Sequence, residues 1–289
     1  MNPLTATPVL FAMMSWALAY ILVKKASVHL GNYLTSLIVL LMGVLPMAAV
    51  VLITGSSWPG AYSVALSILA GVFLCAGFIL AYKSLETEQL TSVVALGEIQ
   101  PAMLTLFGVF VLKESVSIIA AASIILIFAG ALLIITTEGL RINKKLIPAI
   151  LSNVCWLIYW LIITEAVISS STYAFQVMAS RAAGLILILA MFILVPSKTA
   201  STTKIQKLEG IFPIAIILAL LSGIFDGTGD TLFTLTVHSN LVVLGGALTA
   251  LNPLFISVLS YFIYKDRLTR TQAIGFGIMV AGAVALSVL

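Results

Sequence analysis

The sequence predicts an all-α integral membrane protein whose ten transmembrane helices form two inverted five-helix repeats around a central cavity. Three observations support this fold class. The chain is 62% hydrophobic and only 8% charged, whereas soluble domains carry about 25% charged residues. Apolar runs of roughly 20 residues, the length that crosses the hydrocarbon core of a bilayer, recur along the whole chain. The second half of the chain repeats features of the first half at a constant offset.

The apolar runs define the predicted spans. They are continuous and lack the alternation of polar and apolar residues that marks the strands of a membrane barrel, so each run predicts a helix. The longest polar connection, residues 196–209, is rich in Ser, Thr and Lys, as expected for a solvated loop. The predicted spans cover residues 8–27, 33–53, 61–83, 90–112, 117–137, 146–166, 173–195, 211–235, 241–264 and 271–289.

The internal repeat is most evident around two prolines. When Pro101 is placed on Pro253, the charged turns that follow coincide, and so does an Ala-Gly-Ala triplet in the next apolar run. We therefore expect two copies of one unit, residues 1–140 and residues 141–289, within a single membrane domain. Because each copy has five spans, an odd number, the copies cross the membrane in opposite directions, as in many secondary transporters.

The basic residues predict the orientation in the membrane. Twelve of the 14 Lys and Arg residues lie in alternate connections, on the side opposite to both termini. The positive-inside rule assigns that side to the cytoplasm, so both termini are expected outside and the protein is expected in the cytoplasmic (inner) membrane. The pI of about 9.1 reflects these loops, so no nucleic-acid partner is expected. Cys75 and Cys155 lie within apolar runs and are expected to be core residues rather than a disulfide or metal pair.

The second copy carries a further pattern: Asn-Pro at 252–253, Lys-Asp-Arg-Leu-Thr at 265–269, then Gln272, Gly275 and Gly282. It resembles the drug/metabolite transporter superfamily, EamA type, whose members commonly show a Pro, then Gly-Glu-Arg-Leu-Thr, then Gln and Gly. Here Lys-Asp replaces the Gly-Glu, and the first copy keeps Pro101 and Lys113-Glu114 but lacks the Arg-Leu-Thr. The first span contains Ser-Trp-Ala around Trp16, similar to the opening Trp-Gly of the family. The resemblance covers nearly the whole chain.

The resemblance implies a basket of ten helices around a central cavity, a small-molecule substrate, and neither ATP nor a redox cofactor. Members of the family usually keep both termini in the cytoplasm, which is the reverse of the orientation that the charge count predicts here. The motifs do not specify the substrate, the coupling ion, or whether the protein is a monomer or a homodimer.

Acidic residues within the spans are the first candidates for a binding site, because an ionisable group in lipid is costly and usually faces a cavity or a partner. Glu98 precedes Pro101 by three residues, and the proline weakens the helix just upstream. This favours a ligand site at Glu98, with a hydrogen bond to a neighbouring span as the alternative. Asp226 and Asp230 are four residues apart and so share one helical face. Two glycines beside them make a continuous helix less certain, and half-helices hold substrates and ions in transporters.

Two carboxylates so close together repel each other, so one of them is expected to take up a coupling proton. The candidates for proton coupling are Asp226 and Glu98. The alternative places both aspartates at the outer, half-exposed end of the eighth span. Glu165 and Arg181, in the sixth and seventh spans, are predicted to form a structural ion pair, because a single buried charge is costly alone.

Aromatic residues near the middle of two equivalent spans form the second group of candidates. Trp16 and Tyr20 share one face of the first span, and the sixth span carries a similar group. Aromatic faces from both repeats, close to acids on the fourth and eighth spans, predict a cage for a cation. Ordinary packing is the alternative for any one of them. The predicted cage residues are Trp16, Tyr20, Tyr82, Trp156, Tyr159 and Trp160.

Together these features predict a secondary active transporter that moves a small cationic or zwitterionic organic solute, such as an amino acid or an amine, by alternating access. Coupling to a proton or another cation is left open. The alternatives are a broad-specificity efflux carrier for drugs and toxicants and a membrane accessory protein without transport activity. An enzyme or a metal site is not expected, because the sequence has only two His and no His-Glu-x-x-His motif.

Overall fold

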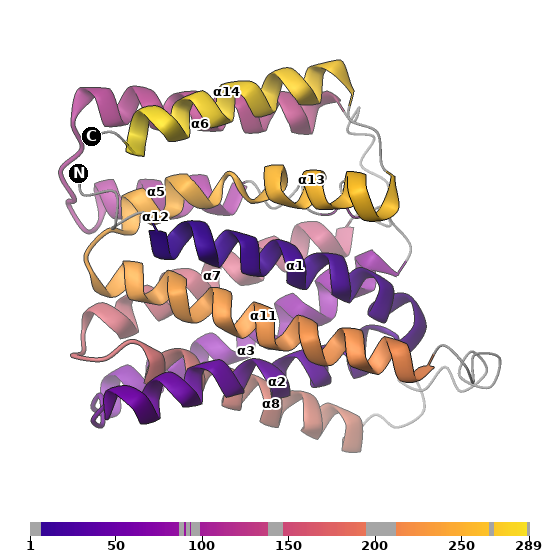
Figure 1. Ribbon diagram of the computed structural model, residues 1–289. Coiled ribbons are helices and arrows are strands. Elements are labelled where there is room, and N and C mark those ends of the chain that lie inside the picture. The colour runs from indigo at the N-terminus through magenta and orange to yellow at the C-terminus, as the bar shows by residue number, and fades with distance from the viewer. Residues whose placement is uncertain are drawn as a thin grey trace.

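The computed structural model describes residues 7–86, 90, 93, 99–137, 147–194, 212–265 and 269–287, and the regular elements in these ranges are all α-helices (Figure 1). The first half contributes α1 (Thr7–Leu30), α2 (Asn32–Thr54), α3 (Ala61–Leu85), α5 (Ile99–Phe110) and α6 (Ile118–Thr137). The second half contributes α7 (Ile147–Ile168), α8 (Ala174–Leu194), α11 (Phe212–His238), α12 (Val242–Thr249), α13 (Asn252–Tyr264) and α14 (Arg270–Ser287). The helices lie side by side in one bundle, and α14 ends at the same end of the bundle where α1 begins.

These helices correspond to the ten predicted spans, and the predicted fold class is confirmed. Seven segments of the described residues are long and apolar enough to cross a membrane, with α12 and most of α13 counted together as Val242–Ile263. Shorter apolar stretches lie within α6 and α14. The fourth predicted span is represented by α5, which begins at Ile99.

The outer surface of the bundle is apolar. Large hydrophobic side chains are exposed on most of the helices, and three of them, Leu52, Ile118 and Ile193, are exposed by 82%, 89% and 76%. Each such side chain would cost about 1.5–3 kcal/mol to keep in water rather than in an apolar environment. The exposed faces therefore suit lipid as the surrounding solvent.

The ninth predicted span is two helices rather than one. α12 ends at Thr249 and α13 begins at Asn252. Pro253 explains the break, because its ring clashes with the preceding turn and it has no N–H to donate, whereas the first turn of a new helix tolerates it well. Pro101 occupies the corresponding place in the first turn of α5. The break lies about a third of the way along the span, so it brings helix ends close to the centre of the bundle.

The turn that enters α12 is held from the other repeat. Glu114, in the connection between α5 and α6, accepts hydrogen bonds from the backbone N–H groups of Val242 (2.9 Å) and Val243 (2.8 Å). A carboxylate at this position satisfies free N–H groups of the first turn and interacts favourably with the helix dipole. Lys113, just before Glu114, has φ of 59°, and its counterpart Lys265 has φ of 58°. This left-handed conformation favours glycine, which explains the Gly of the Gly-Glu pattern.

The two repeats pack against each other symmetrically. α1 lies along α11 while its counterpart α7 lies along α3, α2 contacts α11 as α8 contacts α3, and α6 pairs with α14. Equivalent glycines permit the two long contacts. A Cβ atom at Gly229 would lie 2.6 Å from the indole of Trp16, and one at Gly77 would lie 2.5 Å from the indole of Trp156. Each repeat therefore packs a tryptophan of its first helix onto a glycine of the other repeat.

Candidate functional site

A cavity of about 110 Å³ lies between the two repeats. A single water molecule needs about 10–15 Å³ of such space, so the cavity can hold several waters or a small polar solute. Its wall is formed by α1, α3, α5, α7, α11 and the α12–α13 break, together with Val93. The polar lining residues are Gln100, Ser152, Asn153, Asp226, Asp230, Thr249 and Asn252, and the aromatic ones are Trp16, Tyr20, Phe78, Trp156, Tyr159, Trp160 and Phe233.

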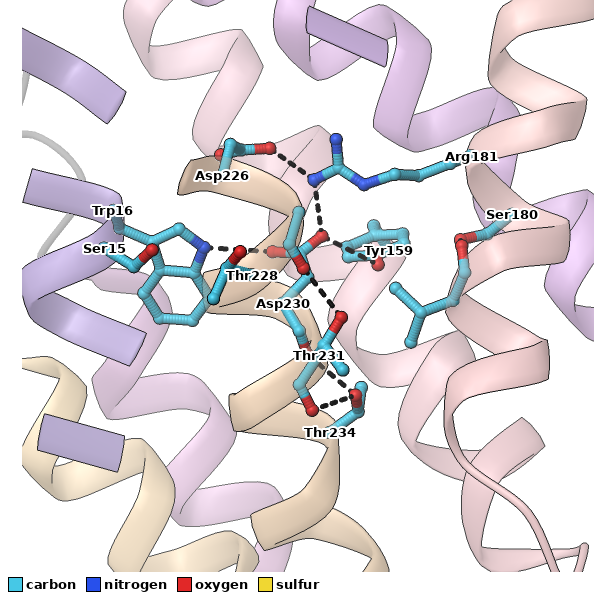
Figure 2. A network of polar contacts seen from close by, with 12 residues as sticks. Ser15, Trp16, Tyr159, Ser180, Arg181, Asp226, Thr228, Asp230, Thr231 and Thr234 are labelled. Carbon is cyan, nitrogen blue, oxygen red and sulfur yellow. Dashed lines mark hydrogen bonds and ion pairs between the residues drawn. The ribbon is translucent and has the colours of Figure 1, made fainter. Parts of the chain in front are cut away.

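Three charged side chains form a largely buried group beside the cavity, and two of them, Asp226 and Asp230, line it. Figure 2 shows this group and its polar contacts. Asp226 and Asp230 project from one face of α11, and the guanidinium of Arg181 on α8 reaches both of them. Arg181 Nη2 donates to Asp230 Oδ2 at 2.8 Å and also to Asp226 Oδ2. With both carboxylates ionised, this triad carries one net negative charge.

The two aspartates have different surroundings. Asp230 accepts a hydrogen bond from Trp16 Nε1 at 3.0 Å and a long one from the hydroxyl of Tyr159 at 3.5 Å, in addition to that from Arg181. Its side chain is 6% exposed, whereas that of Asp226 is 16% exposed. Asp226 borders the main cavity and also a smaller cavity of about 20 Å³ beside it. Asp230 is thus the fixed carboxylate of the pair, and Asp226 is the one more open to a ligand.

Arg181 is completely buried, and neighbouring helices make room for it. A Cβ atom at Gly43 of α2 would overlap Arg181 Nη1 and lie 2.9 Å from Cζ, so a larger residue there would displace the guanidinium. The Phe78 ring lies 5.5 Å from Cζ, close enough for a cation–π contact. The Nε and Nη1 atoms have no hydrogen-bond partner among the described residues. Its charge is therefore balanced chiefly by the two aspartates.

The aromatic side chains form two groups on the cavity wall. Trp16, Trp160 and Phe233 contact one another with ring centroids 4.6–5.9 Å apart, and Trp156 contacts both Tyr20 (6.3 Å) and Phe78 (6.0 Å). Most of these pairs are edge-to-face, the geometry that aromatic pairs favour. The wall of the cavity is therefore built from packed rings that come from both repeats.

Two amides lie at equivalent places in the repeats. Gln100 and Asn252 each directly precede a proline, Pro101 and Pro253, and both amides line the cavity. Asn252 Oδ1 is buried and has no hydrogen-bond partner among the described residues. Buried polar atoms are nearly always satisfied, so this oxygen is a ready acceptor for a ligand donor.

The structure brings most of the predicted binding residues together. Tyr82 differs, because it borders the smaller cavity rather than the main one. Glu98 lies outside the described residues, so its role stays a prediction. The predicted residues that line the main cavity are Trp16, Tyr20, Trp156, Tyr159, Trp160, Asp226 and Asp230.

The predicted ion pair between Glu165 and Arg181 is wrong. Glu165 is exposed on α7 and does not pair with Arg181, which binds the aspartates of α11 instead. The alternative, which placed both aspartates at a half-exposed end of the span, does not fit Asp230, because the residue as a whole is only 4% exposed. The glycines between the aspartates do not interrupt α11, which runs from Phe212 to His238. They permit close packing against α2 and α1 instead.

Other cavity residues were not anticipated from the sequence. The amides Gln100 and Asn252 carried a usable signal, because the duplication places both of them before a proline. Arg181 was noticed, but its partners depend on helix neighbours that the sequence does not reveal. The remaining unanticipated lining residues are Leu74, Phe78, Val93, Pro101, Leu104, Ser152, Asn153, Phe233 and Thr249.

Comparison with known proteins identifies the family. The sequence model of the EamA-like transporter family matches residues 5–136 and, a second time, residues 143–288. The chain belongs to the EamA-like transporter family. This EamA-like chain is thus a multi-pass membrane protein of a transporter family, and the two matched stretches correspond to the two halves of the bundle.

Two further similarities agree with that membership. A Bacillus subtilis (strain 168) protein described as "Uncharacterized transporter YxxF" is 25% identical to this EamA-like chain over 115 residues, which are 40% of the chain. The match spans about a third of that relative's length (33%). A solved structure titled "Crystal structure of protein" matches 100% of this chain and 98% of its own, with a TM-score of 0.71. Its sequence identity of 15% means that it shows the fold alone.

Proposed function

We propose that this transporter is a secondary carrier that moves a small cationic or zwitterionic organic solute, such as an amino acid or an amine, through the central cavity by alternating access. One observation carries the proposal: a pair of aspartates with a surplus negative charge borders a cavity walled by aromatic rings. Asp226 would receive the cationic group of the solute. Trp16, Tyr20 and Trp156 would pack around it.

The surplus negative charge favours the binding of cations in the cavity. An uncompensated charge in a dry interior costs several kcal/mol, and a solute cation beside Asp226 would remove that cost. Each aromatic face that meets the cation adds roughly 0.5–2 kcal/mol. A neutral solute gains from neither effect. The affinity of the cavity should therefore depend on the positive charge of the solute more than on its size.

The amides of the lining suit the polar end of a zwitterion. Gln100, Asn153 and Asn252 supply amides from α5, α7 and α13. Amide N–H groups can donate to a solute carboxylate, and the unpartnered Asn252 Oδ1 can accept from a solute hydroxyl or ammonium. An amino acid offers both kinds of group at once.

The symmetric packing supports alternating access as the proposed mechanism. Both repeats contribute to the cavity, and the main helix contacts of one repeat on the other, α1 with α11 and α2 with α11, have counterparts in α7 with α3 and α8 with α3. In inverted-repeat transporters, rocking of one repeat against the other opens a fixed central site to each side in turn. A proton on Asp226 would cancel the same negative charge as the solute, so proton and solute would compete for it. Glu98 is the second candidate for this proton.

The remaining parts of the proposal concern location and assembly. The distribution of basic residues supports the cytoplasmic membrane with both termini outside. The carrier is proposed to act as a monomer or a homodimer. Broad-specificity efflux of amphipathic cations is the second candidate function, because packed aromatic walls accept varied apolar groups as well as one fixed solute.

A binding experiment with a matched control tests the proposal. Purified protein is screened by thermal unfolding against amino acids and amines, where a solute at 100 times its Kd stabilises the folded state by about 2.7 kcal/mol. The Asp226→Asn variant should lose this stabilisation and should lose uptake in proteoliposomes. The Glu165→Gln variant, with the same chemical change at an exposed site, should keep both. Unchanged affinity and uptake in Asp226→Asn would refute the role of the carboxylate.

A further inference from the structure

The charged triad belongs to one repeat, although the packing around it belongs to both. The contact of Gly229 with Trp16 is equivalent to that of Gly77 with Trp156, and this pairing sets the register between α11 and α3. In that register the residues of α3 that match Asp226 and Asp230 are Leu74 and Phe78. Both acids of the cavity thus stand where the other repeat has apolar side chains.

The arginine shows the same asymmetry. Gly43 of α2 lies against α11, and Gly184 of α8 lies in the same way against α3. Aligning α2 with α8 at these two glycines matches Leu40 with Arg181. Arg181 Nη1 lies beside Gly43 of α2, and Leu40 Cδ2 lies 3.6 Å from the Cβ position of Gly184 of α8. Three positions are therefore apolar in one repeat and charged in the other.

This asymmetry separates the charges from the requirements of the fold. The first repeat builds the same helix contacts with Leu and Phe at these positions, so the packing does not need ions. Replacing a buried ion pair by apolar residues is often neutral or stabilising. The role of the triad is therefore electrostatic: its charge acts on what binds in the cavity. Arg181 sets the amount of that charge, because it balances one of the two carboxylates.

We propose that Arg181 is a specificity-determining residue that limits the solute to a single positive charge in the cavity. With Arg181 in place, the triad has one negative charge to offer, which matches one ammonium group. A second ammonium group would be repelled by the buried guanidinium, which is hydrogen-bonded to both carboxylates, and would have no carboxylate left to balance it. The inference rests on the proposed function, since it assumes that the solute cation binds at Asp226.

Two simple amines distinguish the charge states of the site. n-Butylamine and 1,4-diaminobutane have the same carbon chain and carry one and two ammonium groups at neutral pH. Side chains at positions i and i+4 of a helix are about 5–6 Å apart at Cβ, so two free aspartates of α11 suit the two ends of the diamine. The measurement is the ratio of the two Kd values for purified full-length protein, by calorimetry at pH 7.

The wild type should bind the monoamine at least ten times more tightly than the diamine. Arg181→Gln leaves two negative charges, so it should shift the ratio at least tenfold towards the diamine. Asp230→Asn leaves the group with no net charge, because Arg181 balances Asp226, so this variant should bind both amines at least tenfold more weakly. The double variant Arg181→Gln/Asp230→Asn has one negative charge again and should regain the monoamine preference.

If Arg181→Gln alone does not fold, the double variant still tests the proposal. The double variant removes one positive and one negative charge together, so the net charge of the buried group does not change. Recovery of monoamine binding relative to Asp230→Asn is expected from charge balance and is not expected if Arg181 only supports the structure. An unchanged Kd ratio in Arg181→Gln, or no recovery in the double variant, overturns the role of Arg181 while leaving the proposed function intact. A wild type that binds neither amine nor any amino acid overturns both.

Discussion

The contact between Gly229 and Trp16 allows the most quantitative test of how the site is held. In Gly229→Ala, the new methyl group would lie 2.6 Å from Cδ1 and Nε1 of the Trp16 indole. Carbon atoms pack at about 3.5–4.0 Å, so the ring must move by about 1 Å. The same nitrogen donates the 3.0 Å hydrogen bond to Asp230, and that displacement is enough to break it.

The expected loss of stability has three parts. Forcing a methyl group into a well-packed contact costs about 1–3 kcal/mol. Losing a hydrogen bond to a charged acceptor costs about 1.5–3 kcal/mol. The greater helix propensity of alanine returns about 1 kcal/mol. We therefore expect Gly229→Ala to lower the free energy of unfolding by about 1.5–5 kcal/mol and to weaken binding of the solute at Asp226.

The duplication supplies the control. Gly77→Ala places a methyl group 2.5 Å from the Trp156 indole, and no hydrogen bond from that indole to a carboxylate is found among the described residues. In Gly77→Ala only the packing is disturbed, so the free energy of unfolding should fall by about 2 kcal/mol less than in Gly229→Ala. Gly277 has nothing within 4 Å of its Cβ position. Gly277→Ala should therefore raise the free energy of unfolding by up to about 1 kcal/mol, because alanine has the greater helix propensity.

The assay is denaturant unfolding of the three variants in mixed micelles, followed by tryptophan fluorescence. Equal losses in Gly229→Ala and Gly77→Ala would show that the bond from Trp16 to Asp230 adds nothing to stability. A Gly229→Ala protein as stable as the wild type would refute the close-contact argument itself.

Three further predictions follow from other parts of the structure. Glu114→Ala removes the carboxylate that holds the first turn of α12 and should lower the free energy of unfolding by about 0.5–2 kcal/mol, whereas Glu165→Ala, at an exposed position, should change it by less than about 0.5 kcal/mol. Lys265→Gly relieves a left-handed conformation that costs a side-chain-bearing residue about 1–2 kcal/mol, so the midpoint of thermal unfolding should rise; a fall would show that the conformation is not strained. A single cysteine added at either terminus of a variant without Cys75 and Cys155 should react with a membrane-impermeant maleimide on intact cells, and labelling only after lysis would place the termini in the cytoplasm.

The sequence predicts the helices well because lipid imposes a simple rule on them. A span must be apolar for about 20 residues, so the ten spans can be read directly from hydrophobicity. The break before Pro253 follows from proline chemistry but was missed, because the run of apolar residues continues through it. Hydrophobicity reports where a chain can lie in the membrane and not whether its helix is continuous there.

The partners of charged side chains are harder to predict, as Arg181 shows. Glu165 is close in sequence and stands on the preceding helix, which made it the apparent partner. α8 contacts α2 and α3 extensively, however, and its buried face reaches α11. Glu165 is exposed on α7 and forms no ion pair with Arg181. Pairing depends on the rotation of each helix about its axis, and hydrophobicity constrains that rotation weakly when most faces of a helix are apolar.

In the proposed transport cycle, the asymmetric charge makes the two states of the empty carrier unequal in energy. If the repeats exchanged conformations with identical packing, the two states of an empty carrier would have equal energy. The contact of Trp16 with Gly229 includes a hydrogen bond to Asp230, and the equivalent contact of Trp156 has a leucine and a phenylalanine in place of the acids. If the repeats rock as proposed, loosening the contact of Trp16 therefore costs more free energy than loosening the contact of Trp156. We expect the empty carrier to rest in the state that keeps the hydrogen bond from Trp16 to Asp230.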